Sequence, residues 1–468
     1  MSQPAAAAPR KVHPEEIYQA ELAATEVGRG TARFLVGGFI AILFGIPISQ
    51  AVLELRRGES IQALELFTPL RAAARNAAHG HWRNAVGALR PMVSRQNYRR
   101  FELRMGAASW VKNTVRPRLQ ELMVRWGGFG NETVMLGRDG WLYDEPSFAY
   151  VVGPDFRDPE YMRYSAKRMI DKEGQWDPTP DPTPAILGFA RGLRARGIQL
   201  IVMPVPDKAT LQPAFLPTGS GFGRETTPPN NVGYGRFVAD LRAHGVNVFD
   251  CAPDGADLRQ IRYLVQDTHW APEFMQDVAV RLAGYIRTNV PLAVLPRPHR
   301  LRLEQRRQSG VGNLVDLLGL SARRAAYAPQ TVTLQEVVDE DTGQPWTANA
   351  ESDVLVLGDS FTNIFSRPAN GWGQAAGLAE HLSYELQRPI DVIARDGAGV
   401  WGTRAELMRP DNLTRLACKK LVIYEFSQRY LFGENWRMIP LPPAEAIDAA
   451  RAAAASKPAA ADAVPRSK

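Results

Sequence analysis

The sequence predicts an α/β protein with a parallel sheet flanked by helices, preceded by a transmembrane helix and a helical linker region. Three observations support this prediction. Amphipathic helical segments alternate with short apolar segments from about residue 184, an uncharged run of twenty residues lies near the N-terminus, and Gly-Asp-Ser follows one apolar segment. The chain has 468 residues, 45% of them hydrophobic, and can therefore bury a large core beside these appendages.

The first structural element is the uncharged run itself, residues 34–53, FLVGGFIAILFGIPISQAVL. A helix of this length, at 1.5 Å per residue, crosses about 30 Å of hydrocarbon. The rival interpretation is a cleaved signal peptide, which has a shorter apolar core nearer the terminus and a small-residue cleavage site. Here 33 residues precede the run and LELRRG closes it, so an uncleaved anchor is favoured.

The orientation of this helix is left open by its flanking charges. Four Lys and Arg residues lie within residues 1–33, and four more lie within residues 54–75. The positive-inside comparison is therefore a tie. We expect residues 1–33 to be cytoplasmic and the rest of the chain to be periplasmic, because the chemistry described below resembles that of periplasmic enzymes.

Residues 54–130 are predicted to form helices that link the anchor to the main domain, since apolar residues recur at helical spacing. The region is strongly basic: residues 56–125 hold thirteen arginines and one lysine against four acidic residues, in a chain of net charge +7. Such a stretch could face phospholipid headgroups, an acidic polymer or nucleic acid, or form a solvated helical face. No zinc-finger spacing or recognition-helix motif accompanies it, which disfavours nucleic acid.

The main domain, residues 131–439, begins with a hairpin predicted at VMLGRDGWLYD, where two apolar runs flank a Gly/Asp turn. Helices and strands then alternate, which indicates a parallel sheet covered on both faces. The predicted helices are residues 184–197, 234–245, 271–289 and 371–386. The predicted strands are residues 198–206, 246–250, 353–358, 390–394 and 420–426.

Two segments depart from this alternation. Residues 296–352 begin with the basic RPHRLRLEQRR, contain one predicted strand at 330–338, and are interpreted as an insertion. Alanine, proline and short polar residues dominate residues 440–468, which predicts a disordered tail. No carbohydrate-binding module is evident there.

Ser360 is the candidate nucleophile. It follows the apolar VLVLGD and so lies at the carboxyl end of a predicted strand, where open α/β sheets bind ligands. Gly358 permits a sharp turn, and the Ser360 amide at the start of a helix could help to hold a developing oxyanion. The alternative is that Ser360 only ends a strand and starts a helix. Because Thr362 occupies the last position of a G-x-S-x-G elbow, an ordinary α/β-hydrolase is disfavoured.

A serine nucleophile needs a base, and usually a carboxylate that orients the base. Among seven histidines, His269 in LVQDTHWAPEF is the best candidate, because Asp267 lies two residues upstream on the same predicted loop. The alternative is that Asp267 or Thr268 caps the next helix and His269 lies on the surface. Two potential ligands without a third give a metal site weak support, so no metal is expected.

Several motifs together resemble a known family. GDSF and DTHW resemble the serine and Asp/His blocks of SGNH/GDSL hydrolases, but in reversed chain order. This order, the N-terminal anchor and the motifs GRDGWLYD (137–144), PVPDKATLQPAFLP (204–217) and EFSQRYL (425–431) resemble the AlgJ/AlgX-type polysaccharide O-acetyltransferases of Gram-negative bacteria. The similarity runs from about residue 134 to 432. It implies a circularly permuted SGNH-like fold with Asp267, His269 and Ser360 as the catalytic triad.

The resemblance implies transfer of acetyl groups onto hydroxyls of an exported polysaccharide, without a cofactor. The acetyl group would come through a membrane-bound O-acyltransferase partner, and the catalytic domain would lie in the periplasm, anchored in the inner membrane. Two alternatives stay open. One is a carbohydrate acetylesterase of the SGNH type, and the other is a non-catalytic scaffold of a polysaccharide-modification complex.

Further candidates for substrate or oxyanion contacts lie near predicted strand ends, and for the charged ones structural ion pairing is the alternative. They are Gly358, Asp359, Lys208, Asp207, Arg395 and Arg429. The loop at 394–402, ARDGAGVWG, is the best candidate for an oxyanion site. Cys251 and Cys418 do not form a CxxC pair, and the sequence leaves open whether they form a disulfide.

Overall fold

A computed structural model describes residues 28–447 except 91–93, 174–176, 223–226, 254, 256, 296–298, 321–326, 398, 444 and 446. Most of the predicted cytoplasmic segment 1–33 and most of the predicted tail 440–468 therefore lie outside the described residues. The chain divides into two units, residues 1–119 and 120–468. Each unit is described by itself.

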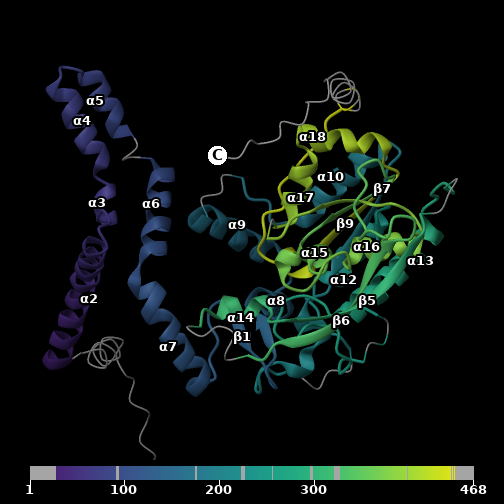
Figure 1. Cartoon of the computed structure of the whole chain (residues 1–468), viewed down its shortest axis with the longest axis horizontal. Coiled ribbons are helices and arrows are strands. Elements are labelled where there is room, and N and C mark those ends of the chain that lie inside the picture. The colour runs from purple at the N-terminus through teal and green to yellow at the C-terminus, as the bar shows by residue number, and fades with distance from the viewer. Residues whose placement is uncertain are drawn as a thin grey trace, which may run out of the picture. The chain divides into compact units, whose positions relative to one another are not determined.

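The described part of the first unit is helical (Figure 1). Its α-helices are α2 (Arg29–Arg56), α3 (Gln62–Glu65), α4 (Thr68–Ala78), α5 (Trp82–Leu89) and α6 (Arg95–Ala108), and α7 (Arg116–Leu122) crosses into the second unit. Within the described residues, α2 alone is long and apolar enough to cross a membrane, and a signal sequence would have the same properties. Its side chains are largely exposed, with Phe34 at 79% and Phe39 at 64%.

The C-terminal end of α2 is fixed by polar contacts inside the first unit. The buried carboxylate of Glu54 accepts hydrogen bonds from the backbone N–H of Gln62 (3.1 Å) and from the side chain of Gln50 (2.9 Å). Trp110 donates its backbone N–H to Gln50 and its indole N–H to Ser49, both at 2.9 Å. The C-terminal end of α2 therefore has defined hydrogen-bond partners, whereas the apolar side chains before it are largely exposed.

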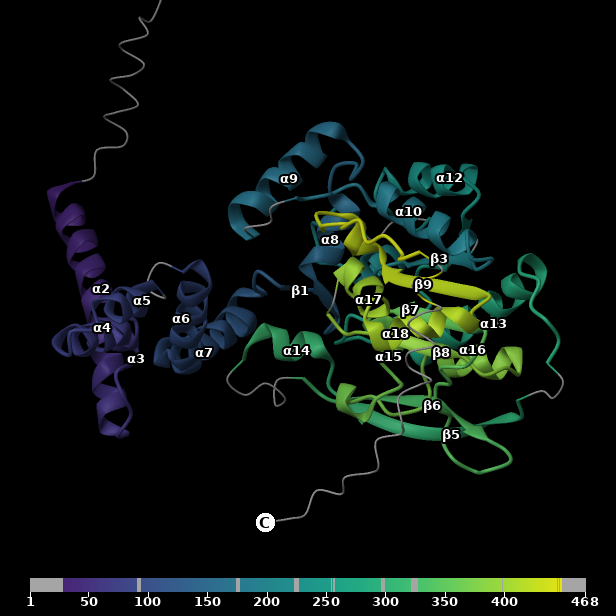
Figure 2. The same cartoon turned by 90° about the horizontal axis from the view of Figure 1, so that it is seen from above.

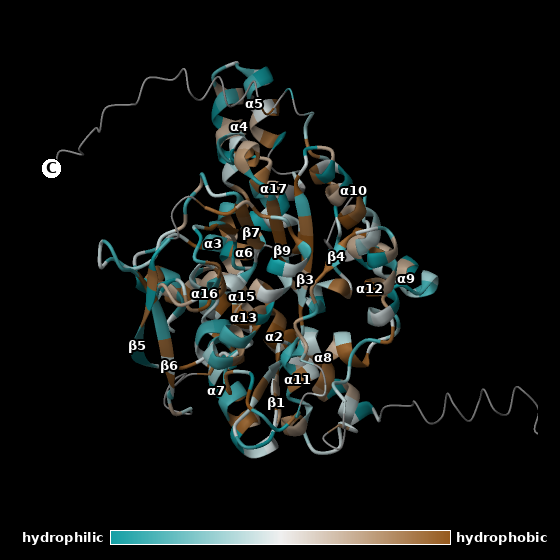
Figure 3. Ribbon diagram, turned by 90° about the vertical axis from the view of Figure 1, so that its right-hand side faces the viewer, coloured by the Kyte–Doolittle hydropathy of each residue, from teal (hydrophilic) through white to brown (hydrophobic). Residues whose placement is uncertain are grey.

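A five-stranded sheet forms the centre of the second unit, and all its strands are parallel in the order β4-β3-β9-β7-β8. The strands are β3 (Gln199–Val205), β4 (Asn247–Val248), β7 (Val354–Gly358), β8 (Asp391–Ala394) and β9 (Leu421–Ser427). Every residue of β7 and β9 is buried, and Figure 3 shows these strands as mostly hydrophobic. Near-continuous apolar strands are what a sheet covered on both faces requires.

Helices cover the sheet as predicted. Two pairs of helices pack against each other beside the sheet (Figure 2). One pair is α10 (Pro182–Arg194) and α12 (Tyr234–Ala243), and the other is α13 (Pro272–Asn289) and α16 (Leu378–Leu386). The other α-helices of this unit are α8 (Glu145–Val152), α9 (Pro159–Glu173), α11 (Lys208–Leu211), α14 (Asn313–Leu318), α15 (Ser360–Asn363), α17 (Gly399–Leu407) and α18 (Pro410–Leu413). The predicted α/β architecture is confirmed.

The helix predicted at residues 371–386 is wrong in its first half, because α16 begins only at Leu378. Gly371, Gly373 and Ala375 have positive φ angles of 82°, 124° and 48°. A right-handed helix requires negative φ at each residue. The segment before Leu378 is therefore a loop, and it brings Trp372 toward the site described below.

Two antiparallel strand pairs form separate sheets beside the main one. β1 (Val134–Leu136) pairs with β2 (Leu142–Asp144), as the Gly/Asp turn predicted. In the predicted insertion, β5 (Leu301–Gly310) pairs antiparallel with β6 (Gln330–Asp339) along ten residues (Figure 2). The strand predicted at 330–338 is thus confirmed, and β5, whose sequence is mostly polar, is its partner.

Candidate active site

The carboxyl ends of the parallel strands meet at one edge of the sheet, and polar residues follow four of the five strands. Asp207 follows β3, Ser360 follows β7, Arg395 follows β8 and Arg429 follows β9. A cavity of about 560 Å³ lies in this region. Its lining includes Asp267, His269, Asn313, Ser360, Asn370, Asp396, Gly397, Arg429 and Tyr430. The predicted triad residues therefore line one cavity.

The turn that carries Ser360 is tied to the neighbouring strand β9. Asp359 caps α15, since its Oδ1 accepts the backbone N–H of Phe361 at 2.7 Å. Its Oδ2 accepts the backbone N–H of Ser427 at 3.1 Å, and its own N–H donates to Glu425 Oε2 at 2.9 Å. Three hydrogen bonds thus fix the backbone on which Ser360 begins the helix.

Gly358 is required by the tightness of the same turn. A Cβ at this position would lie 2.1 Å from Thr362 Oγ1 and 2.8 Å from Glu425 Oε2. Thr362 Oγ1 donates to Glu425 Oε2 at 2.8 Å. Burial and the neighbouring Asp359 raise the pKa of Glu425 well above its ordinary value. Gly358 acts by leaving space beneath Ser360.

His269 and Asp267 form a short, buried pair. The distance from His269 Nδ1 to Asp267 Oδ1 is 2.5 Å, and both residues are at most 4% exposed. The other oxygen, Asp267 Oδ2, accepts the backbone N–H of Asn313 at 2.9 Å and the indole N–H of Trp372 at 3.0 Å. Burial alone would raise the pKa of Asp267, but His269 and these donors outweigh it and hold that pKa well below its usual range. The carboxylate is therefore ionised and holds the imidazole through Nδ1.

The alternative assignment for this loop, a helix cap beside a surface histidine, is wrong. The N-cap of α13 is Ala271, and no side chain caps that helix. His269 is only 4% exposed. Thr268 bonds to the side chain of Asn313, which fastens the loop to the segment predicted to be an insertion. The loop therefore holds His269 and Asp267 in the interior of the protein.

The second ring nitrogen, His269 Nε2, is buried and has no hydrogen-bond partner among the described residues. The ring of Phe361, the residue after Ser360, packs edge-on against the imidazole with 4.9 Å between centroids. Ser360 and His269 line the same cavity without a hydrogen bond between them. Bonds of this kind are often long in unliganded sites and shorten when substrate binds.

Arg429 lines the cavity beside Tyr430 and forms ion pairs with two buried carboxylates. Its guanidinium lies 3.2 Å from Asp207 and 3.6 Å from Asp144. Burial raises the pKa of Asp207 to about 6, against the lowering effect of Arg429. Arg429 therefore presents a fixed positive charge in the cavity.

The remaining predicted residues lie around the cavity. Lys208 and Asp207 are fully buried, and Asp359 is 3% exposed beneath Ser360. Arg395 lines a neighbouring cleft, where it pairs with Glu406 at 2.6 Å. Of the loop at 394–402, Asp396 and Gly397 line the cavity.

Asn313 and Trp372, the two N–H donors to Asp267 Oδ2, were not predicted as site residues. Asn313 acts on Asp267 through its backbone N–H, which no side-chain motif reveals. Trp372 lies in the loop that was predicted to be helical. A signal was present in the sequence, because GWG places two glycines around this tryptophan and indicates a turn.

We expect Gly312→Ala to lower the free energy of unfolding by about 2 kcal/mol, the typical cost of overpacking. A Cβ there would lie 2.1 Å from the Gln266 carbonyl oxygen and 2.6 Å from the Asp267 amide, both backbone atoms that cannot rotate away. Denaturant unfolding measures the effect. The matched control is Gly284→Ala in α13, where an added Cβ meets nothing within 4 Å. Equal stability of the two variants would contradict the prediction.

Neither a metal cluster nor a disulfide occurs in the part of the chain that the structure describes. No three His, Cys, Asp or Glu side chains in these residues are grouped so as to hold a metal ion. Cys251 and Cys418 are both free thiols.

Comparison with known proteins supplies independent information. The model of the family described as "SGNH hydrolase-like domain, acetyltransferase AlgX" matches residues 134–428. The probable alginate O-acetylase AlgJ of Pseudomonas aeruginosa is 26% identical over 317 residues, which cover 64% of this chain and 71% of that protein. AlgJ of Pseudomonas fluorescens is 27% identical over 321 residues, covering 65% and 70%.

Two solved structures are similar to the chain. The O-acetyltransferase domain of Pseudomonas putida AlgJ has a TM-score of 0.46 at 21% identity, covering 69% of this chain and all of that one. AlgX of Pseudomonas aeruginosa has a TM-score of 0.43 at 18% identity, covering 63% of each chain.

Proposed function

The chain belongs to the family of SGNH hydrolase-like domains that includes the acetyltransferase AlgX, and we propose that it transfers acetyl groups to hydroxyls of an exported polysaccharide through an acetyl-serine intermediate. The observation that carries the proposal is the buried His269–Asp267 pair at 2.5 Å, with a free Nε2, in the cavity that Ser360 lines. A polysaccharide acceptor is inferred from the curated relatives, which are named for alginate.

In the first half-reaction, Ser360 Oγ attacks the carbonyl carbon of the acetyl donor while His269 Nε2 takes the hydroxyl proton. Asp267 stabilises the imidazolium that forms, because its ionised carboxylate lies against Nδ1. The tetrahedral intermediate then collapses, the donor's leaving oxygen takes the proton from Nε2, and the acetyl group remains on Ser360 as an ester.

In the second half-reaction, a sugar hydroxyl occupies the place of the leaving group. His269 Nε2 takes its proton, the sugar oxygen attacks the acetyl carbon, and Ser360 Oγ leaves and recovers the proton. Transfer instead of hydrolysis requires that the sugar outcompete water at this step. The acceptor must therefore bind in the cavity before the ester is attacked.

Negative charge develops on the acetyl oxygen in both steps. The Ser360 amide at the start of α15 and the positively charged Arg429 in the cavity lining are the groups we assign to it. Asp207 and Asp144 hold Arg429 from behind, so its position does not depend on the substrate.

The membrane anchor and the donor partner complete the proposal. We assign α2 as an uncleaved transmembrane anchor that places the catalytic unit in the periplasm, since its apolar side chains are exposed along the predicted span. A membrane-bound O-acyltransferase is proposed as the source of acetyl groups. Extraction of membranes with alkaline carbonate tests the anchor, because release of the full-length chain would contradict it.

Acetylation of Ser360 tests the chemistry. Full-length protein in an uncharged detergent is incubated with 4-nitrophenyl acetate, quenched in acid, digested and analysed by mass spectrometry. We expect one acetyl group on the peptide that contains Ser360, and its loss to an added acceptor oligosaccharide with formation of acetylated sugar. Free acetate as the sole product in the presence of oligosaccharides would favour the acetylesterase alternative. No acetyl-peptide and no ester cleavage would favour the scaffold alternative.

Trp372→Phe should lower kcat about 10- to 100-fold with little change in KM. The substitution removes one of the two N–H donors to Asp267 Oδ2, and a hydrogen bond to a charged group contributes about 1.5–3 kcal/mol. Ester cleavage measures both constants. Trp346→Phe is the control, since this buried indole donates to Ser383 instead, at 2.8 Å. Equal loss of kcat in the two variants would mean that Trp372 acts only through general stability.

A further inference from the structure

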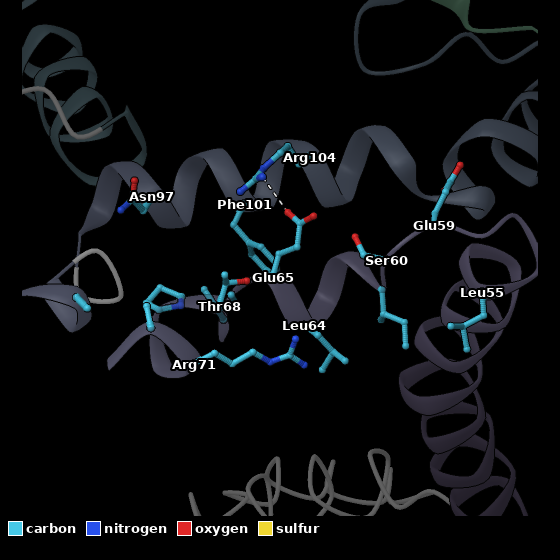
Figure 4. Close-up of a pocket in the computed structure, with 15 residues that line it drawn as sticks. Leu55, Glu59, Ser60, Leu64, Glu65, Thr68, Arg71, Asn97, Phe101 and Arg104 are labelled. Carbon is cyan, nitrogen blue, oxygen red and sulfur yellow. Dashed lines mark hydrogen bonds and ion pairs between the residues drawn. The ribbon is translucent and has the colours of Figure 1, made fainter. Parts of the chain in front are cut away.

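The first unit contains a groove of about 930 Å³ that the proposed chemistry does not use (Figure 4). It is lined by residues of α2, α3, α4, α5, α6 and the loop after α2. Most of its surface is apolar, contributed by side chains that include Leu55, Ile61, Leu64, Leu66 and Phe101. A groove of this size and polarity is typical of sites for small amphipathic ligands.

Two arginines, Arg71 and Arg104, and two glutamates, Glu59 and Glu65, line this groove. Arg104 makes an ion pair with Glu65 at 2.9 Å, and the arginine side chain remains 63% exposed. Arg71 is exposed, lies beside Leu64 in Figure 4, and makes no ion pair with any residue that the structure describes. The groove therefore combines an apolar lining with guanidinium groups that have capacity for an anion.

The surrounding helices share this combination. Residues 56–119 hold twelve arginines and one lysine against three glutamates, so their positive charge is mostly uncompensated within the segment. The same helices expose large apolar side chains, including Trp82 at 66%, Val86 at 64% and Leu103 at 63%. Basic, amphipathic helices with an exposed tryptophan are suited to an anionic lipid surface.

We propose that this groove binds an anionic phospholipid, with acyl-chain carbons on its apolar lining and the headgroup phosphate at Arg71 and Arg104. Leu55, one residue before the end of α2, is part of the lining. If α2 is the membrane anchor, the groove begins where the chain leaves the bilayer, and lipid is the ligand present there at the highest concentration. The inference rests on that part of the proposed function and is independent of acetyl transfer.

Native mass spectrometry of the full-length protein, released from an uncharged detergent, tests the proposal. The protein is titrated with dioleoylphosphatidylglycerol and, separately, with dioleoylphosphatidylcholine, which has the same chains but no net charge. We expect one retained phosphatidylglycerol per chain, and weaker retention of phosphatidylcholine. Arg71→Glu should weaken phosphatidylglycerol binding about tenfold or more, because it replaces a favourable charge with a repulsive one.

Two further variants make the result decisive. Ala88→Trp fills the groove without a charge change and should also lower retention. Arg259→Glu makes the same charge change at an exposed arginine of the second unit and should bind lipid like wild type. Equal retention by all variants would mean that lipid only surrounds α2, and would overturn the proposal. Displacement of the lipid by an equal concentration of glycerol phosphate would also overturn it, since the apolar lining would then contribute nothing.

This experiment separates failure of the lipid site from failure of the proposed function. Ser360→Ala should retain phosphatidylglycerol like wild type, so absence of acetyl transfer leaves the lipid result unaffected. Carbonate extraction reports on the anchor alone. If the protein is anchored and active but retains no phosphatidylglycerol, only the proposed lipid site in the groove would be rejected.

Discussion

Replacing Ser360 with alanine is expected to lower acetyl transfer by a factor of about 10³ or more and to leave the free energy of unfolding within about 1 kcal/mol of wild type. The substitution removes the oxygen on which the acetyl ester would form, while the turn keeps the three hydrogen bonds through Asp359. Initial rates of 4-nitrophenyl acetate cleavage and acetylation of an oligosaccharide measure the loss. Denaturant unfolding measures the stability.

His269→Gln should cost about as much as Ser360→Ala, and the double variant should be no worse than either single one. Groups that act as one unit show this lack of additivity, because loss of either disables the same step. His244→Gln is the matched control. This exposed histidine ends α12, where its Nδ1 lies 2.8 Å from the Asp240 carbonyl oxygen, and it is absent from the cavity lining. Additive losses in the double variant would contradict a shared role for Ser360 and His269.

The fold was predictable from the sequence because its main strands are buried on both faces. VLVLG, KLVIYEF and IQLIVMPVP are mostly apolar, and they form β7, β9 and β3. The glycines at 197 and 245 marked the ends of helices correctly, and both have positive φ. Family membership was also predictable, since several weak motifs occurred in one order. β5 was harder to predict, because most residues of its LRLEQRRQSG are polar, and the core side chains of this two-stranded sheet come mainly from β6.

The candidate site was predictable only where side chains act through a recognisable spacing. Asp267 and His269 are two residues apart, and the structure places them in contact. Asn313 lies in the predicted insertion and acts through its backbone N–H. Trp372 contacts the Asp267 carboxylate from a loop that was predicted to be helical. Both contacts join segments that are more than forty residues distant from Asp267 in the chain. Such contacts depend on how the loops pack, which local patterns do not encode.

The role of Lys208 also depends on packing that the sequence does not reveal. Lys208 was predicted to lie near the substrate, but it is fully buried. Its Nζ lies within hydrogen-bond distance of four backbone carbonyl oxygens, which share its three N–H groups: Leu142 at 2.6 Å, Leu264 at 2.7 Å, Val265 at 2.8 Å and Asp267 at 3.0 Å. These acceptors belong to the β1–β2 hairpin and to the loop that carries His269 and Asp267. Lys208 thus holds both segments together at the carboxyl end of β3, and we interpret it as a positioning residue.

Lys208→Met should lower the free energy of unfolding by about 3 kcal/mol, because it leaves buried carbonyl groups without a donor. It should also lower the kcat of the folded protein by about 100-fold, since a displacement of about 1 Å at reacting groups has an effect of this size. The control is Lys419→Met. Lys419 is also buried. It donates to the Ala350 and Ser352 carbonyls at 2.6 and 2.7 Å and lies 3.1 Å from Asp391, but it precedes β9, at the opposite edge of the sheet. The Lys419→Met variant should lose stability but keep the kcat of wild type.

The stability difference between wild type and Lys208→Met should depend on pH in a defined direction. Burial lowers the pKa of Lys208 from 10.5 to about 7, against the opposing effects of Asp267 and Asp144. Between these values the unfolded chain binds more protons at this residue than the folded chain does. Wild type should therefore gain stability relative to the variant as the pH rises from about 7 to 10, and the difference should be constant below 7. A difference that is constant across this range would mean that the ammonium group keeps its ordinary pKa, and that the four carbonyl oxygens fully offset the cost of its burial.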